Sequence, residues 1–280
     1  MMTPGHTEGG DRRPIGVFDS GVGGLTVARA LMDLLPDERI VYVGDTARGP
    51  YGPRDLDEVR GFTAEIVHHL AAQDVKLAVA ACNTATAAMT EADRAGFPLP
   101  VEGVIEPAVR AAVRATCTGR VGVIGTTGTI GSGAYDAAVQ ATGAPVELVS
   151  QACPRFVELV EAGRTTDEEV LAVARYYLDP LLSANVDTVI LGCTHYPLLT
   201  GVLSYVLGPG TVLVSSAEET ARSVFARLVD TGALSDGALA DSHRFVSSGE
   251  PTAFAALAHR FLGPRLTDTA IEPLPVGAAS

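Results

Sequence analysis

IGVFDSGVGGL (15–25) joins a short apolar run to a glycine-rich turn and then to the start of an amphipathic segment. The apolar run 15–18 has the composition of a buried strand, and the leucines after the turn lie on or near one face of a predicted helix: Leu25, Leu31, Leu34 and Leu35. A strand that leads through a turn into a helix is the repeating unit of α/β folds. This stretch therefore predicts the fold class.

The same alternation continues along the chain. Further strands are predicted at 40–44, 75–82, 101–105, 120–125, 145–150, 186–193 and 211–215. Helical segments separate most of them, and the strands are apolar throughout, which is typical of a parallel sheet covered on both faces. We therefore expect an α/β fold with doubly wound parallel sheets.

The chain also contains a weak internal repeat. FDSGVGG (18–24) has a counterpart in IGTTGTIGSG (124–133), and AVAACNTAT (78–86) has one in VILGCTHYP (189–197). The two pairs are separated by nearly equal distances along the chain. The repeat predicts two similar domains related by pseudo-twofold symmetry, with the active site in the cleft between them.

The proposed domain division places residues 14–105 and 217–270 in the first domain and 106–216 in the second. The discontinuity arises because the helical segments 216–232 and 251–262 follow the second half and are expected to return to the first. Residues 1–13 are polar and lack an apolar centre, so they do not resemble a secretory signal. We expect them to form a disordered tail.

Composition and charge disfavour several classes of protein. The net charge is −13 and no cluster of Lys and Arg occurs, so nucleic acid is not an expected partner. No apolar run of about 18 residues is present, so a membrane span is not expected. The four cysteines are dispersed without a C-x-x-C pair, which predicts no zinc site and reduced thiols in a cytoplasmic protein.

Four predicted strand ends carry small polar side chains. They are Asp19-Ser20, Cys82-Asn83-Thr84, Thr126-Thr127 with Thr129, and Cys193-Thr194-His195. Ligands of open parallel sheets bind at the carboxyl ends of strands. A helix that starts there offers N–H groups to a carboxylate and lowers the pKa of a thiol. Two such anion sites and two thiols suit a small dicarboxylate.

Two opposed thiols suit the inversion of a stereocentre. The proton must leave one face of the carbon and return on the other, which requires two monoprotic groups that exchange the roles of acid and base. The weak acidity of an amino-acid α-proton also requires hydrogen bonds to the carboxylate on which charge develops. Serine, threonine, asparagine and backbone donors serve that purpose.

These motifs resemble the glutamate racemases of the aspartate/glutamate racemase family. The resemblance rests on PIGVFDSGVGGL (14–25), VYVGDTARGPYGPR (41–54), ACNTATA (81–87), VIGTTGTI (123–130), ACPRFVELVE (152–161) and VILGCTHYPLL (189–199). The motifs occur in family order and cover nearly all of residues 14–262. The pair ACNTA and GCTHYP is the specific part of the signal.

The resemblance implies cofactor-independent interconversion of L- and D-glutamate, with D-glutamate supplied for peptidoglycan synthesis. It implies that Cys82 and Cys193 are the catalytic thiols, and that Asp19, His195 and Glu161 assist them. The residues implied to contact glutamate are Asp19, Ser20, Tyr51, Gly52, Asn83, Thr84, Thr126, Thr129, Thr194 and His195. One departure is Glu158, where family members commonly carry proline.

Other interpretations stay open at this point. The chain could act on aspartate, a hydantoin or a malonate-type acid, although the decarboxylases among those relatives lack one of the two thiols. A non-catalytic protein that binds an acidic ligand in its cleft is a third interpretation, which leaves the matched thiols unexplained. No P-loop and no metal-ligand cluster is present, so neither ATP nor a metal ion is expected. A homodimer is left open.

Overall fold

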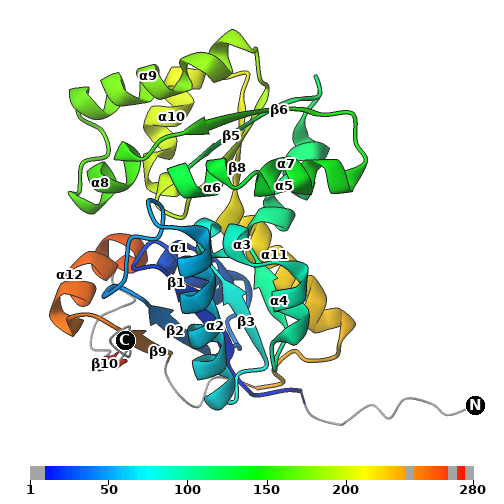
Figure 1. Ribbon diagram of the computed structural model, residues 1–280, viewed down its shortest axis with the longest axis vertical. Coiled ribbons are helices and arrows are strands. Elements are labelled where there is room, and N and C mark those ends of the chain that lie inside the picture. Colours follow the sequence, from blue (N-terminus) through cyan, green and yellow to red (C-terminus); the bar gives the residue numbers. More distant parts are fainter. Residues whose placement is uncertain (1–9, 238–242, 264–269, 275–280) are drawn as a thin grey trace, which may run out of the picture.

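The computed structural model describes residues 10–237, 243–263 and 270–274, and it contains two parallel sheets (Figure 1). The first has the order β10-β9-β2-β1-β3-β4 and the second β6-β5-β7-β8. Every adjacent pair of strands is parallel. The predicted α/β class with parallel sheets is therefore confirmed.

The strands of the first sheet are β1 (Ile15–Asp19), β2 (Ile40–Gly44), β3 (Leu77–Ala80), β4 (Val101–Gly103), β9 (Arg244–Ser247) and β10 (Ile271–Pro273). Those of the second are β5 (Arg120–Gly125), β6 (Glu147–Ala152), β7 (Thr188–Gly192) and β8 (Val212–Ser215). Eight of these correspond to the predicted strands. β9 and β10 were not predicted, because each is short and β10 contains a proline, which a sheet tolerates at its edge.

The two sheets repeat one topology. In each, the first strand lies between the second and the third, and the fourth lies outside the third, giving β2-β1-β3-β4 and β6-β5-β7-β8. β1 therefore corresponds to β5, and β3 corresponds to β7. This equivalence is the structural form of the internal repeat, and it places Cys82 and Cys193 after corresponding strands.

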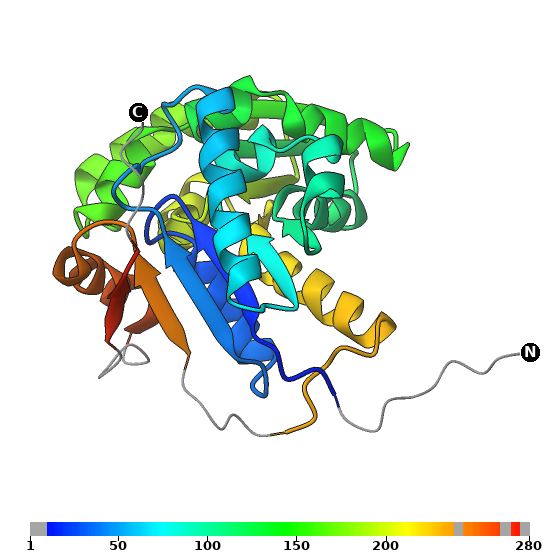
Figure 2. The ribbon, with the colours of Figure 1, turned by 60° about the horizontal axis from the view of Figure 1, so that its bottom comes forward.

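Helices cover both faces of each sheet (Figures 1 and 2). In the first, α1 (Leu25–Leu34), α11 (Ser216–Asp230) and α12 (Pro251–Leu262) cover one face, and α2 (Leu56–Ala72), α3 (Asn83–Ala88) and α4 (Glu91–Gly96) lie on the other. In the second, α5 (Ile105–Ala115) and α7 (Ala134–Thr142) lie opposite α9 (Glu168–Ser183) and α10 (Thr200–Leu207). α6 (Thr127–Gly131), α8 (Arg155–Glu161) and the 3₁₀ turn Tyr196–Leu199 follow strands that end at the cleft.

One apolar cluster runs through both halves of the molecule. It includes Val17 and Leu31 from the first sheet and its helices, and Leu191 and Leu178 from the second. Alternate residues of β1 face this cluster, while Phe18 faces a separate cluster beneath α2. Helices α11 and α12 pack against α1, and α11 also packs against α5.

The end of the N-terminal segment packs against the body of the protein. The backbone carbonyl of Asp11 accepts a hydrogen bond of 2.8 Å from buried Lys76, and Arg12 pairs with Asp236 at 2.8 Å. The predicted tail is therefore too long by at least these residues, because Lys76 supplies a buried donor that the local sequence does not reveal. Residues 1–9 lie outside the described part. Within the described ranges, no helix is long and apolar enough to cross a membrane.

Candidate active site

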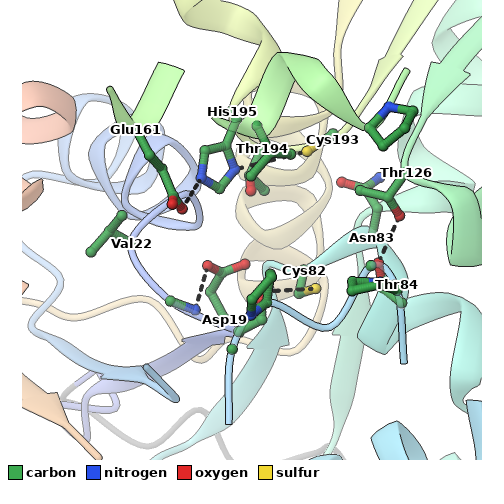
Figure 3. Close-up of a pocket in the computed structure, with 18 of the residues that line it drawn as sticks. Asp19, Val22, Cys82, Asn83, Thr84, Thr126, Glu161, Cys193, Thr194 and His195 are labelled. Carbon is green, nitrogen blue, oxygen red and sulfur yellow. Dashed lines mark hydrogen bonds and ion pairs between the residues drawn. The ribbon is translucent and has the colours of Figure 1, made fainter. Parts of the chain in front are cut away.

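The carboxyl ends of the two sheets line one cavity of about 320 Å³ (Figure 3). Its wall includes eleven of the predicted site residues: Asp19, Ser20, Gly52, Cys82, Asn83, Thr84, Thr126, Glu161, Cys193, Thr194 and His195. Segments more than 170 residues apart in the chain meet here because corresponding strands of the two sheets point their ends at the same space. Among the described residues of the wall there is no Lys or Arg.

Cys82 lies between β3 and α3 at the floor of the cavity. Its Sγ accepts a hydrogen bond of 3.4 Å from the N–H of Ala85 and lies 3.8 Å from Ser20 Oγ. Burial raises the pKa of the Cys82 thiol to about 12, and the charge of Asp19 adds to the rise. The expectation of a lowered pKa at this helix start is wrong, because a single N–H donor does not offset burial beside a carboxylate. Cys82 is therefore a protonated acid at neutral pH.

Cys193 follows β7 and faces the cavity from the opposite domain. Its Sγ lies 3.8 Å from Nδ1 of His195, whose Nε2 lies 3.0 Å from Glu161 Oε1. Burial would lower the pKa of His195, but hydrogen bonds and charges from Cys193, Glu161 and Asp19 raise it to about 10. His195 is therefore an imidazolium at neutral pH, with one N–H for the thiol and one for the carboxylate.

Asp19 ends β1 and lies between the two halves of the site, with its carboxylate directed toward His195 and Cys82 (Figure 3). One oxygen accepts a hydrogen bond of 2.9 Å from the N–H of Gly21. Burial raises the pKa of Asp19, while the charge of His195 and neighbouring backbone N–H groups partly oppose the rise. Asp19 therefore acts electrostatically on Cys82 and on His195, which lies beside the second thiol.

Polar side chains fill the wall between the thiols. Asn83 donates a 2.9 Å hydrogen bond to the hydroxyl of Tyr135, and its buried Oδ1 has no partner among the described residues. The hydroxyls of Thr84, Thr126 and Thr129 form a triangle with sides of 3.0–3.1 Å. The triangle joins the two domains, since Thr84 starts α3 and the other two lie at α6. The free acceptor on Asn83 suits an ammonium group.

Two predicted binding residues do not line the cavity. Thr129 is fully buried behind Thr84 and Thr126. Tyr51 is also fully buried, and its hydroxyl donates to Asp45, which also accepts hydrogen bonds from Arg48 at 2.7 Å and from Ser248 at 2.6 Å. Tyr51 therefore anchors the loop that presents its neighbour Gly52 to the cavity.

Several wall residues were not predicted. They are Gly21, Val22, Thr46, Gly49, Pro50, Pro53, Pro154, Val157, Glu158 and Leu257. All but Leu257 lie within the motifs quoted above, so their position next to predicted site residues could have identified them. Leu257 is different, because it lies on α12 and reaches the cavity only through the return of that helix to the first domain.

The two domains approach closely at two glycines. A Cβ on Gly23 would lie 2.4 Å from Thr194 Oγ1 and 2.5 Å from the His195 ring, and a Cβ on Gly52 would lie 2.9 Å from Thr126 Cβ. Hydrogen bonds reinforce both contacts, from Thr26 Oγ1 to the Thr194 carbonyl at 3.1 Å and from the N–H of Gly128 to the Gly52 carbonyl at 2.8 Å. The cavity is therefore held closed on two sides.

The family model for Asp/Glu/Hydantoin racemase matches residues 25–224. The chain belongs to this family. It is 56% identical over 268 residues to a glutamate racemase from Beutenbergia cavernae, with 91% of each chain covered. The structure of a glutamate racemase isoform from Bacillus anthracis aligns with a TM-score of 0.90 at 41% identity, covering 95% of this chain and 98% of that one.

A second solved structure of a family member contains a ligand. The glutamate racemase from Francisella tularensis, crystallised in complex with D-glutamate, aligns with a TM-score of 0.87 at 32% identity. The alignment covers 94% of this chain and 98% of that chain. The architecture of two similar α/β domains is thus shared with glutamate racemases along nearly the whole chain.

Proposed function

We propose that this chain interconverts L-glutamate and D-glutamate with Cys82 and Cys193 as the two acid/base groups. The observation that carries the proposal is their placement, since one thiol follows β3 and the other follows the equivalent β7, and both line one cavity. The relatives named glutamate racemase support the same substrate. A protein that only binds an acidic ligand has no need of thiols at both positions.

The protonated state of Cys82 fits one direction of the reaction. Cys193 takes the α-proton from L-glutamate, and Cys82, which is protonated, delivers its proton to the opposite face. The proton that Cys193 gains and the one that Cys82 loses must be exchanged with solvent before the next turnover in that direction. D-glutamate is converted by the same two transfers in reverse.

Glutamate must be held without lysine or arginine. We propose that the carboxylates accept hydrogen bonds from hydroxyls and backbone N–H groups at Ser20, Thr84, Thr126 and Thr194, and that the free Oδ1 of Asn83 receives the ammonium group. Donors already fixed at a carboxylate stabilise the charge that develops there as the proton leaves.

Chiral chromatography of L-glutamate incubated with the purified protein tests the activity directly. We expect an equal mixture of enantiomers without added cofactor, including after dialysis against a chelator and hydroxylamine. Activity restored only by pyridoxal phosphate or a metal ion would contradict the proposed mechanism. Aspartate is the control substrate, because it is one methylene shorter than glutamate and a methylene contributes only about 1–3 kcal/mol to discrimination between substrates. Equal rates with aspartate and glutamate would show that glutamate is not the preferred substrate.

Asp19 and His195 are predicted to assist the thiols rather than to hold the substrate. Asp19→Asn and His195→Asn should each lower kcat about tenfold and change KM little, because the lost interaction matters mainly in the transition state. The two enantiomers have equal free energy, so kcat/KM must fall by the same factor in both directions. Initial rates from each enantiomer provide the measurement, and a raised KM with unchanged kcat would identify a substrate anchor instead.

The cellular role follows from the product. D-glutamate is a building block of peptidoglycan, and we propose that the chain supplies it in the cytoplasm. Depletion of the protein should make growth depend on added D-glutamate, and rescue by L-glutamate alone would contradict this role.

A further inference from the structure

Helix α12 belongs to the first domain, but it contacts His195 and the backbone of Glu161 in the second. It packs on α1 and β10, and Figure 1 shows it beside α8. Leu257 lines the cavity, Arg260 contacts the end of α8, and Phe261 contacts His195. Leu257 thus faces the cavity, and about one helical turn later Arg260 and Phe261 contact the opposite domain.

Phe261 fixes the ring of His195. The two rings meet edge to face, with centroids 5.4 Å apart and an interplanar angle of 86°. Phe261 is 3% exposed, so its ring has little freedom to move away. This contact holds the imidazole plane in which Nδ1 points to Cys193 and Nε2 points to Glu161.

Arg260 fixes Glu161, the residue that pairs with His195. Its guanidinium donates hydrogen bonds to the backbone carbonyls of Val160, at 3.5 Å, and of Glu161. These carbonyls lie at the end of α8, where the helix dipole attracts a cation, and that of Val160 also accepts a hydrogen bond of 2.9 Å from the N–H of Gly163. The contact therefore holds the backbone of the residue whose carboxylate accepts from His195.

We propose that Phe261 and Arg260 are positioning residues for the His195–Glu161 pair and, through it, for Cys193. Neither lines the cavity among the described residues, so both act through the pair. The first domain thus aligns the acid/base group of the second, and Cys193 is fully assisted only while α12 rests against α8. This inference rests on the proposed racemase function.

A double-mutant cycle separates positioning from general support of the fold. Phe261→Leu should lower kcat/KM about tenfold in the otherwise unaltered enzyme, because small misplacements of a catalytic group are costly. In the His195→Asn background, the same substitution should lower kcat/KM less than about twofold, because that variant has no imidazole for Phe261 to hold. Phe261→Met provides a second variant if the leucine variant proves unstable.

Phe254→Leu is the matched control. Phe254 is a buried phenylalanine of the same helix, but it packs on Tyr42, with centroids 6.0 Å apart, rather than on His195. Its substitution should have the same effect on kcat/KM with and without His195. Arg260→Gln should show the coupled behaviour with Glu161→Gln, and Arg260→Lys should recover most of the lost activity.

The outcomes distinguish this inference from the function on which it rests. Coupling of Phe261 with His195, together with additivity of Phe254, supports the positioning role. If Phe261→Leu lowers kcat/KM equally in both backgrounds, α12 only stabilises the closed domains and the inference is overturned. If the unaltered protein fails to racemise glutamate, the proposed function is overturned first.

Discussion

Replacing either Cys82 or Cys193 by alanine should lower the rate of racemisation by at least about 10³-fold, because each variant lacks one of the two proton-transfer groups. The remaining thiol should still remove the proton on its own side. In D₂O, Cys82→Ala should therefore introduce deuterium slowly at the α-position of L-glutamate without forming D-glutamate. Cys193→Ala should do the converse, and mass spectrometry after chiral separation measures both.

The exchange is expected to be slow, since the remaining thiol must trade its proton with solvent inside a closed cavity. Cys117→Ala is the matched control, because this thiol is exposed and lies outside the cavity wall, and it should leave the rate unchanged. Substantial racemisation by either single variant would refute the two-base assignment. Exchange with the opposite enantiomer in each variant would keep the mechanism and reverse the roles.

Gly23→Ala should lower kcat/KM roughly a hundredfold. The new methyl group would lie 2.4 Å from Thr194 Oγ1 and 2.5 Å from the imidazole of His195, so the domains or the ring must shift. Overpacking of this kind costs about 1–3 kcal/mol, and each 1.36 kcal/mol at the transition state is a factor of ten in rate. Steady-state kinetics with both enantiomers measures the loss.

Gly61→Ala is the control for this prediction. It places the same methyl group on α2, where nothing lies within 4 Å, and alanine stabilises a helix relative to glycine by about 1 kcal/mol. Its activity should match that of the unaltered enzyme. Full activity in Gly23→Ala would mean that the close approach of the two domains at this point is not needed for catalysis.

Local sequence was sufficient to predict the parts of the site that follow strands. Asp19, Cys82 and Cys193 each come directly after an apolar run. Because ligands of parallel sheets bind at the carboxyl ends of strands, these three residues were predicted to lie in one site. β9 and β10 were missed because neither has a long apolar run. Their absence also hid the packing surface on which α12 rests, and with it Leu257 as part of the cavity.

The remaining errors concern burial, which local sequence encodes poorly. Tyr51 adjoins Gly52 in a motif, but successive side chains of an extended loop point in different directions, and its ring enters the core beneath α2. The thiol of Cys82 starts a helix, which favours ionisation, yet it is enclosed beside Asp19, and the cost of burying a charge is larger. Both outcomes depend on groups distant in sequence.

The apolar cluster that crosses from one sheet to the other bears on how the molecule moves and melts. Two domains with separate interiors can swing apart at little cost, but here any wide separation would break the apolar contacts that join the two halves into one interior. Glutamate must then enter and leave through small displacements at the rim of the cavity. On heating, the protein should therefore unfold in a single cooperative transition rather than two, as measured by calorimetry.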